Sequence, residues 1–309
     1  KTNLFMNYNY YQQFPQPQQF TQPLYQTQPP IQYYQQQIIA PTVPQYLPDQ
    51  TVIPDRYKSF AELESALKLA GIDSIQMMFA FDFSRSNEWS GQKSIGHHMH
   101  ALLPNNPYIQ VLNVLAPILP NFDDDGIYPA FRFGCSQTRD QGVLPLQFPI
   151  QDPHYEGIPN LIAGYSEVAK QQLQLSGPTT FSPIIKKAVE ICQAYGGRQL
   201  IFVLILTDGD VSNLQLDQQM LNWASQWPIS FCAVGLGDGP FDKMKFFDDM
   251  PGRKFDNFQF VDFTGLNMKY KFERQECPEV LLATEIFQEL PEQFNRLSAI
   301  TQKSRSLSN

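Results

Sequence analysis

The segment from Leu200 to Leu206 reads Leu-Ile-Phe-Val-Leu-Ile-Leu and carries no polar residue. A strand with one face in water alternates apolar and polar residues, because successive side chains point to opposite faces of the sheet. A run without alternation is typical of a central strand in a parallel sheet that is covered on both faces. This segment therefore predicts a sheet with helices on each side.

Segments of strand and helix character alternate along the rest of the chain. Further strands are predicted at 76–82, 127–135, 229–235 and 258–263. Helices are predicted at 59–71, 106–119, 157–173, 183–196, 215–226, 241–249 and 279–300, the last with a break at Pro291. The first helix has signals at both ends, since Ser59 and Glu62 predict a capping box and Gly71 predicts a stop. Because strands that alternate with helices form βαβ units, the predicted fold class is α/β, a doubly wound, mainly parallel sheet flanked by helices.

The N-terminal segment differs in composition from the rest of the chain. There is no charged residue between Lys1 and Asp49, and residues 1–50 hold 14 Gln, 8 Pro and 7 Tyr. Such a segment has too few aliphatic residues to offset its ordering entropy, so we expect residues 1–55 to form a disordered tail. The tail would serve as a spacer or as a self-associating or partner-docking segment. Residues 56–300 would then form the folded domain, followed by a polar tail at 301–309.

Composition also limits the class of protein. The net charge of −8 and the lack of a basic run argue against non-specific nucleic-acid binding. No apolar stretch reaches the roughly 18–20 residues of a membrane span, and the N-terminus lacks a signal-peptide pattern. The four cysteines lie 57, 40 and 45 residues apart, which fits neither a zinc site nor a redox pair. We expect a cytoplasmic protein, with the nucleus or a peripheral position at a membrane as alternatives.

Side chains with oxygen ligands follow two of the predicted strands. Asp82, Ser84 and Ser86 come at the end of the first strand, and Asp208 follows the central strand. Thr179 lies between them in the chain, just before a predicted helix. Ligands of open α/β sheets bind beyond the carboxyl ends of the strands, so we expect these five residues to converge there. An all-oxygen set suits a hard cation such as Mg²⁺ or Mn²⁺. The alternative is that both aspartates only end strands and cap helices.

Two other motifs suggest chemistry, and a simpler explanation is preferred for each. His97, His98 and His100 could bind zinc, but no further ligand lies nearby at a standard spacing, so a partly exposed helix face is expected. The glycine-rich segment at 235–239 could cradle a phosphate. It lacks the third glycine of a dinucleotide fingerprint and a Walker lysine, so a loop before a helix is expected.

Three motifs of this chain also occur, in the same order, in a known family. D-x-S-x-S begins at Asp82, G-x-T at Gly177 and T-D-G at Thr207. Together they resemble the metal-ion-dependent adhesion site of von Willebrand factor A domains. The flanking segments most closely resemble the copine-type A domain of plant RING-domain ubiquitin ligases; these segments are 82–91, 177–183, 235–240 and 255–261. The resemblance covers residues 57–297 and implies that the five residues above are metal ligands.

The chain also departs from the proteins it resembles. Copines carry tandem C2 domains before this module, and a tail of residues 1–55 is too short to hold one. The ligases carry a C-terminal RING, whereas residues 277–309 contain one cysteine and no histidine. Neither calcium-driven lipid binding nor ubiquitin transfer is therefore expected from the resemblance.

Three functional hypotheses follow. The first is a non-enzymatic module in which a bound Mg²⁺ or Mn²⁺ bridges to an Asp or Glu of a protein partner. The second is a component of a ubiquitin ligase whose RING lies outside this chain. The third is a copine-like signalling protein associated with a membrane.

Overall fold

The computed structural model describes residues 53–72, 75–123, 125–197, 199–267 and 278–306. The chain divides into two units, Lys1–Val43 and Pro44–Asn309, and every described residue belongs to the second. The predicted tail at 1–55 therefore lies outside the described residues, except for 53–55.

The described part of the second unit is built on a seven-stranded sheet in the order β3-β2-β1-β5-β6-β7, with β4 pairing with β2. The strands are β1 (Gln76–Asp82), β2 (Ile127–Phe133), β3 (Leu144–Pro145), β4 (His154–Glu156), β5 (Ile201–Thr207), β6 (Ile229–Gly235) and β7 (Phe258–Asp262). All pairings among β1, β2, β5, β6 and β7 are parallel. The predicted central strand, β5, lies between β1 and β6 and is buried at every position. The α/β class and the mainly parallel sheet are confirmed.

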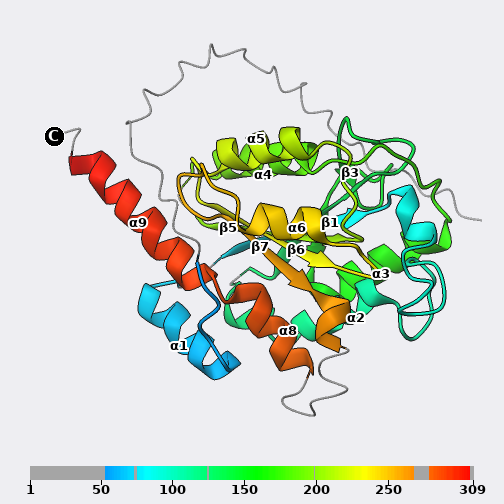
Figure 1. Ribbon diagram of the computed structural model, residues 1–309, viewed down its shortest axis with the longest axis horizontal. Helices are drawn as coiled ribbons and strands as arrows, with labels where there is room; N and C mark the ends of the chain where they lie inside the picture. Colours follow the sequence, from blue (N-terminus) through cyan, green and yellow to red (C-terminus); the bar gives the residue numbers. More distant parts are fainter. Residues whose placement is uncertain (1–52, 73–74, 124, 198, 268–277, 307–309) are drawn as a thin grey trace, which may run out of the picture. The chain divides into compact units, whose positions relative to one another are not determined.

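Helices cover both faces of this sheet (Figure 1). The helices are α1 (Phe60–Ala70), α2 (Pro107–Leu115), α3 (Gly157–Lys170), α4 (Ser182–Ala194), α5 (Leu214–Ala224), α6 (Asp242–Asp248), α8 (Pro278–Phe287) and α9 (Leu290–Ser306). Short 3-10 turns, η1 (Arg85–Glu88) and η2 (Leu119–Asn121), lie between them. Met77, Phe79 and Phe81 of β1 pack in the core formed with α1, α2, α3 and α8. Met78 and Ala80 pack in the core formed with α4, α5 and α6. One strand thus contributes to two cores, which explains why its sequence shows no alternation.

Two short antiparallel strands that were not predicted cover the outer edge of β2. β3 pairs with Phe131 and Arg132, and β4 pairs with residues 127–129. Each strand is too short to produce a recognisable period in the sequence. Covering an edge in this way blocks its unpaired backbone groups from another chain. β2 itself ends at Phe133 rather than at 135, because Gly134 adopts a left-handed conformation with φ of 76°.

The C-terminal helical segment divides at a slightly different place than predicted. α8 ends at Phe287 and α9 begins at Leu290, so Pro291 stands in the first turn of α9 and not at the break. A proline is tolerated in a first turn because its missing N–H would have had no helical partner there. α9 continues to Ser306, beyond the domain boundary at 300 that the sequence suggested.

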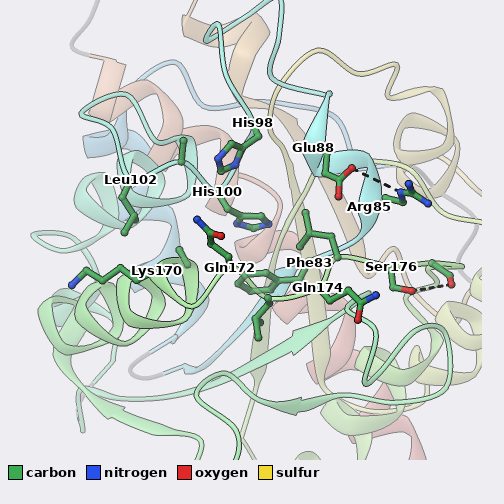
Figure 2. A pocket seen from close by; sticks show the side chains of 15 residues that line it. Phe83, Arg85, Glu88, His98, His100, Leu102, Lys170, Gln172, Gln174 and Ser176 are labelled. Carbon is green, nitrogen blue, oxygen red and sulfur yellow. Dashed lines mark hydrogen bonds and ion pairs between the residues drawn. The ribbon is translucent and has the colours of Figure 1, made fainter.

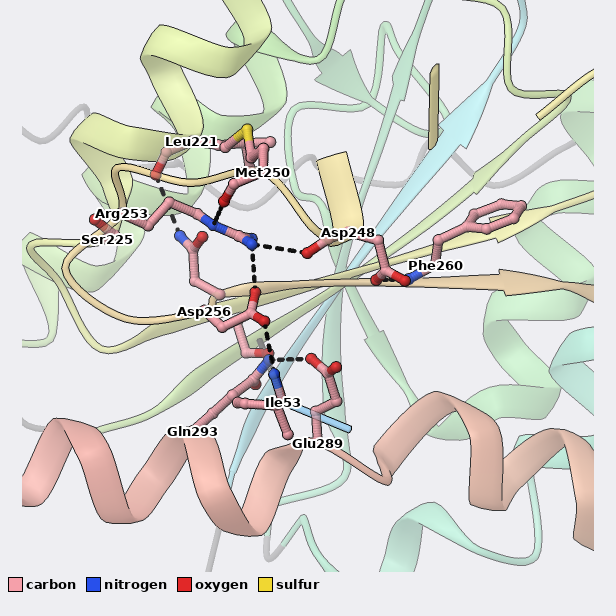
Figure 3. Close-up of polar contacts among 12 residues, drawn as sticks. Ile53, Leu221, Ser225, Asp248, Met250, Arg253, Asp256, Phe260, Glu289 and Gln293 are labelled. Atoms are coloured by element: carbon pink, nitrogen blue, oxygen red, sulfur yellow. Dashed lines mark hydrogen bonds and ion pairs between the residues drawn. The ribbon is translucent and has the colours of Figure 1, made fainter. Parts of the chain in front are cut away.

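A cluster of buried charged side chains lies near the junction of α8 and α9 (Figure 3). Arg253 pairs with Asp256 at 2.6 Å, and each side chain is only 3% exposed. The backbone N–H of Ile53 donates to Asp256 at 3.2 Å, which ties the start of the described chain to the cluster. Burial raises the pKa of Asp248 to about 8. Burial, followed by the charges of Asp256 and Asp248, raises the pKa of Glu289 to about 10. Both carboxyls are therefore protonated at neutral pH.

Three cysteines fall within the described residues, and all are free and buried: Cys135, Cys192 and Cys232. Burial raises the pKa of the Cys192 thiol to about 11 and that of the Cys232 thiol well above its usual value. Both are therefore protonated at neutral pH. Across the described residues, no helix combines the length and apolar character needed to cross a membrane.

Candidate metal site

The order of the strands creates a crevice at the carboxyl ends of β1 and β5. These strands are neighbours, and the chain continues from β1 to β2 on one side and from β5 to β6 on the other. Such a switch point is where open α/β sheets bind ligands. Asp82 is the last residue of β1, and Asp208 directly follows β5. The fold therefore brings the two predicted carboxylates to one crevice.

Residues 82–90, called the metal loop below, curl around the Asp82 side chain. The backbone N–H of Ser84 donates to Asp82 Oδ1 at 2.8 Å. The hydroxyl of Thr207 donates to Asp82 Oδ2 at 2.7 Å. The hydroxyls of Ser84 and Ser86 lie 3.0 Å apart. The alternate spacing of these serines thus places both hydroxyls together.

Asp208 is held by hydroxyls of the same loop. Ser90 donates to Asp208 Oδ2 at 3.0 Å, although the two residues are 118 positions apart in the chain. A hydrogen bond from Ser86 also reaches the Asp208 carboxylate. Asp82, Ser84, Ser86 and Asp208 therefore form one connected group.

Thr179 lies on a neighbouring segment and is less directly connected. The residue is buried. Its backbone N–H donates to the Ser212 hydroxyl at 3.1 Å, and its backbone carbonyl accepts from the Ser212 N–H at 2.7 Å. Among the described residues, no hydrogen bond joins the Thr179 hydroxyl to the other four predicted ligands. Its segment is nevertheless attached to the metal loop, because the N–H of Arg85 donates to the carbonyl of Ser176 at 2.7 Å.

Burial and mutual repulsion disfavour two negative charges in this crevice. Burial, followed by the charge of Asp208, raises the pKa of Asp82 to about 7. Burial also raises the pKa of Asp208, and hydrogen bonds from Ser86, Asp210 and Ser90 oppose the rise. A cation between the two carboxylates would favour their charged forms.

The metal loop is also held by residues that the sequence did not mark as part of the site. The hydroxyl of Tyr108 on α2 lies 2.9 Å from the backbone carbonyl of Asp82 and 2.7 Å from the side-chain oxygen of Asn87. The amide of Asn87 donates to the carbonyl and hydroxyl of Ser84, each at 3.2 Å. A Cβ on Gly134 would stand 2.8 Å from the Ser84 nitrogen, so only glycine fits there. Ser90 and Thr207 belong to the segments quoted above, but nothing near Tyr108 marks it in the sequence.

The partly exposed helix face predicted for the histidine cluster is not a helix, although the cluster is partly exposed. The segment 97–100 consists of bends and turns, and His100 is buried while His98 is exposed. The His100 ring stacks on Phe83 with centroids 4.3 Å apart, and its Nδ1 lies 2.9 Å from the Tyr165 hydroxyl. Burial, followed by the charge of His98, lowers the pKa of His100 to about 3. His100 is therefore neutral, and packing against α3 explains its burial.

The glycine-rich segment after β6 is a loop before α6, as expected. Its Asp238 side chain accepts hydrogen bonds from the backbone of Lys93 at 2.9 Å and of Ser94 at 2.7 Å. The segment thereby fixes the chain that follows the metal loop.

The donor set fits a hard divalent cation. Carboxylate and hydroxyl oxygens are the ligands that Mg²⁺ and Mn²⁺ accept in proteins, with waters completing the shell. Among the described residues, no group of three or more His, Cys, Asp or Glu is placed to hold a metal. A metal at this crevice would thus depend on serine and threonine hydroxyls as well as on the two aspartates.

Comparison with known proteins identifies the family. The copine family model matches residues 96–306. The chain is 37% identical over 258 residues to the E3 ubiquitin-protein ligase RGLG2 of Arabidopsis thaliana, a match that covers 78% of this chain and 54% of the relative. It is 33% identical to RGLG3 of the same plant, covering 81% of this chain and 71% of the relative. It is 33% identical to Copine family protein 1 of Caenorhabditis elegans, covering 81% of this chain and 22% of the relative. The chain thus spans about half the length of RGLG2.

Solved structures that align with this chain share little sequence with it. The VWA domain of SpRpn10 aligns with a TM-score of 0.41 and 10% identity, covering 61% of this chain and 87% of that one. Proximal thread matrix protein 1 from the mussel byssus, with a zinc-occupied MIDAS motif, aligns with a TM-score of 0.41 and 14% identity, covering 70% of this chain and 48% of that one.

The family model matches well over half of the chain, and the relatives named above exceed 30% identity. The chain therefore belongs to the copine family, and its sheet has the von Willebrand factor A fold that the motifs suggested.

Proposed function

We propose that this protein is a cation-dependent protein-interaction module. A Mg²⁺ or Mn²⁺ ion would be held by Asp82, Ser84, Ser86, Thr179 and Asp208. The observation that carries this proposal is the pair of buried aspartates at the ends of adjacent strands, linked by serine and threonine hydroxyls. Two carboxylates in such a crevice favour a divalent cation over an empty or protonated state.

The partner would supply an Asp or Glu to the ion. Hydroxyl ligands are neutral, so the two carboxylates balance the charge of the ion without exceeding it, and the occupied site does not repel a further carboxylate. Waters fill the remaining octahedral positions of Mg²⁺, and a partner carboxylate can replace one of them. The interaction therefore requires the ion, and it selects partners with an accessible acidic residue.

A second candidate function is recognition within a ubiquitin ligase. It is favoured by the identity to relatives named E3 ubiquitin-protein ligases. In that case the module would select the protein to be modified, and the transfer itself would be carried out by other parts of the ligase. The metal-dependent contact would be the same in both cases.

The test is affinity capture of protein partners in Mn²⁺ and in chelator, with two variants. Asp82→Asn keeps the shape of the side chain and removes its charge, so partners captured by the wild type should be lost. Asp152→Ala is the matched control, because Asp152 is an exposed aspartate beside His154 and away from the crevice. Capture that persists in chelator and with Asp82→Asn would refute the metal bridge. Ubiquitination of a captured partner, assayed with ubiquitin, E1, E2 and a RING-containing ligase component added, would support the ligase role.

A further inference from the structure

A large cavity adjoins the metal loop (Figure 2). It has a volume of about 1170 Å³. One side is formed by Arg85 and Glu88 of η1, and another by Ser176 and Gly177, which precede the predicted ligand Thr179. The cavity is thus bounded by the two segments that carry four of the five predicted metal ligands.

The lining of the cavity is mixed, and its apolar part is made by leucines and an aromatic stack. Leu102, Leu173 and Leu175 line it together with the stacked rings of Phe83 and His100. His100 is only 6% exposed, and its ring interacts with the backbone of Asp82 in the metal loop.

The charges around the cavity favour an acidic ligand. Arg85 and Lys170 line it together with one carboxylate, Glu88. Lys170 also pairs at the surface with Glu167 at 2.6 Å, and such exposed pairs are weak enough to exchange for another acidic group. Arg85 and Glu88 lie 3.8 Å apart and their side chains are 71% and 52% exposed, so this pair is weak and open to exchange. The cationic edge contrasts with the net charge of −8 of the whole chain.

We propose that the cavity is a second subsite for the same partner. The partner segment is extended and acidic, and its Asp or Glu binds the ion. The cavity receives the apolar residue next to that Asp or Glu. The inference rests on the proposed function and deepens it, because the ion would provide affinity for any carboxylate and the cavity would select the sequence around it. Leu102, Leu173 and Leu175 contact the apolar side chain, and Arg85 and Lys170 face the acidic flanks.

The size and position of the cavity favour a polypeptide over a small molecule. Small-molecule sites usually occupy about 300–1,000 Å³, and this cavity is larger. The hydrogen bond from Arg85 N–H to the Ser176 carbonyl joins the metal loop to the opposite wall of the cavity, so the two subsites share one backbone framework. A chain that places a carboxylate on the ion can therefore continue into the cavity.

The experiment uses two adjacent leucines as a matched pair. Leu102 lines the cavity and is 38% exposed, whereas Leu103 does not line it and is 48% exposed. Leu102→Glu and Leu103→Glu add the same charge at the surface, where substitutions usually change stability by less than about 0.5 kcal/mol. Each variant and the wild type are applied, in Mn²⁺ and in chelator, to an array of synthetic decapeptides. Every peptide has a central Asp, and each flanking position is varied through all residue types.

We expect the wild type to bind peptides with an apolar residue beside the central Asp and acidic residues further out, in Mn²⁺ only. Leu102→Glu should lower the affinity for these peptides about tenfold or more, and Leu103→Glu should leave the affinity within about twofold of the wild type. Equal effects of the two variants, or metal-dependent binding without a flanking preference, would overturn the subsite and leave the metal bridge standing. Binding that persists in chelator but is lost in Leu102→Glu would refute the metal bridge and retain the cavity as a peptide site. No binding to any peptide would refute both.

Discussion

Replacing Asp82 with asparagine should stabilise the metal-free protein while it abolishes the response to metal. Asparagine has nearly the shape of aspartate, so the crevice can keep its geometry. Its side-chain oxygen can accept from the Ser84 N–H, as Asp82 Oδ1 does at 2.8 Å. Its amide can donate to the Thr207 hydroxyl, because a hydroxyl accepts as well as donates. The substitution therefore removes a charge, and only the Thr207 hydroxyl proton loses its acceptor.

The magnitude follows from the electrostatics of the crevice. Burial and the charge of Asp208 raise the pKa of Asp82 from 3.8 to about 7. At about 1.4 kcal/mol per pH unit, keeping Asp82 ionised in the folded protein at pH 8 costs up to about 4 kcal/mol. Two hydrogen bonds to a charged acceptor become neutral ones, a loss of about 1 kcal/mol each. The net stabilisation should be about 2 kcal/mol, or about 4–8 °C in Tm for a domain of this size.

The sign of the pH dependence provides an internal control. A carboxyl whose pKa is raised on folding contributes stability that is complete below its unfolded pKa and is lost as pH rises through the folded pKa. In chelator, the wild type should therefore lose stability between about pH 4 and pH 8 relative to Asp82→Asn. The two proteins should have similar stability at about pH 3 and below, where Asp82 is protonated in both folded and unfolded chains.

Thermal unfolding followed by circular dichroism in chelator, and then in Mn²⁺ or Mg²⁺, measures both effects. Metal should raise the Tm of the wild type, because a ligand that binds only the folded state stabilises it. Metal should leave the Tm of Asp82→Asn unchanged. A variant that is less stable than the wild type in chelator at pH 8, or that keeps a metal-induced shift, would show that the electrostatic account of the crevice is wrong.

Three further predictions test other parts of the structure. The free energy of unfolding, measured in urea with chelator, should fall by several kcal/mol from pH 6 to pH 9, at about 1.4 kcal/mol per pH unit for each carboxyl that is protonated only in the folded protein. Asp248 contributes up to about pH 8 and Glu289 over the whole range. A rise would contradict their burial as neutral acids. Gly134→Ala should destabilise the protein by about 1–3 kcal/mol, because the φ of 76° at Gly134 and its contact with the metal loop both exclude a Cβ. It should also weaken Mn²⁺ binding, measured by calorimetry. Unchanged binding would count against a role of Gly134 in positioning the metal loop. Tyr108→Phe should lower stability by about 1–2 kcal/mol by chemical denaturation, since the backbone carbonyl of Asp82 and the Asn87 side chain lose a donor; a neutral effect would show that water replaces the hydroxyl.

Local signals in the sequence were sufficient for much of the fold. Ser59 accepts from the Glu62 N–H at 3.3 Å, and Gly71 ends α1 with φ of 78°, because capping depends on residues a few positions apart. The Glu62 carboxylate accepts from the Lys58 N–H rather than from that of Ser59, so the capping box is only half formed. The signal for the buried central strand was also local, since an apolar run can be recognised without knowing which distant residues pack against it.

Features that depend on contacts across the chain were beyond sequence reasoning. His100 was expected on a partly exposed helix face, but it is enclosed by Phe83, Tyr108 and Tyr165, which come from separate segments of the fold. The same holds for the hydroxyl of Tyr108 behind Asp82, which is 26 positions away. No periodicity or spacing encodes which side chain packs against another at such distances.

The metal loop and the cavity share a wall, and this links their two ligands. Arg85 lies between Ser84 and Ser86, lines the cavity, and is fixed by its N–H to the Ser176 carbonyl at 2.7 Å. An ion that draws Ser84 and Ser86 into its coordination shell thereby sets the position of Arg85 at the edge of the cavity. A peptide that contacts Arg85 meets a more ordered edge when the ion is bound, so the ion increases its affinity. Because linkage is reciprocal, the peptide must increase the affinity for the ion by the same factor. Selection of the partner by sequence and dependence on metal are therefore expected to be one coupled property of this crevice.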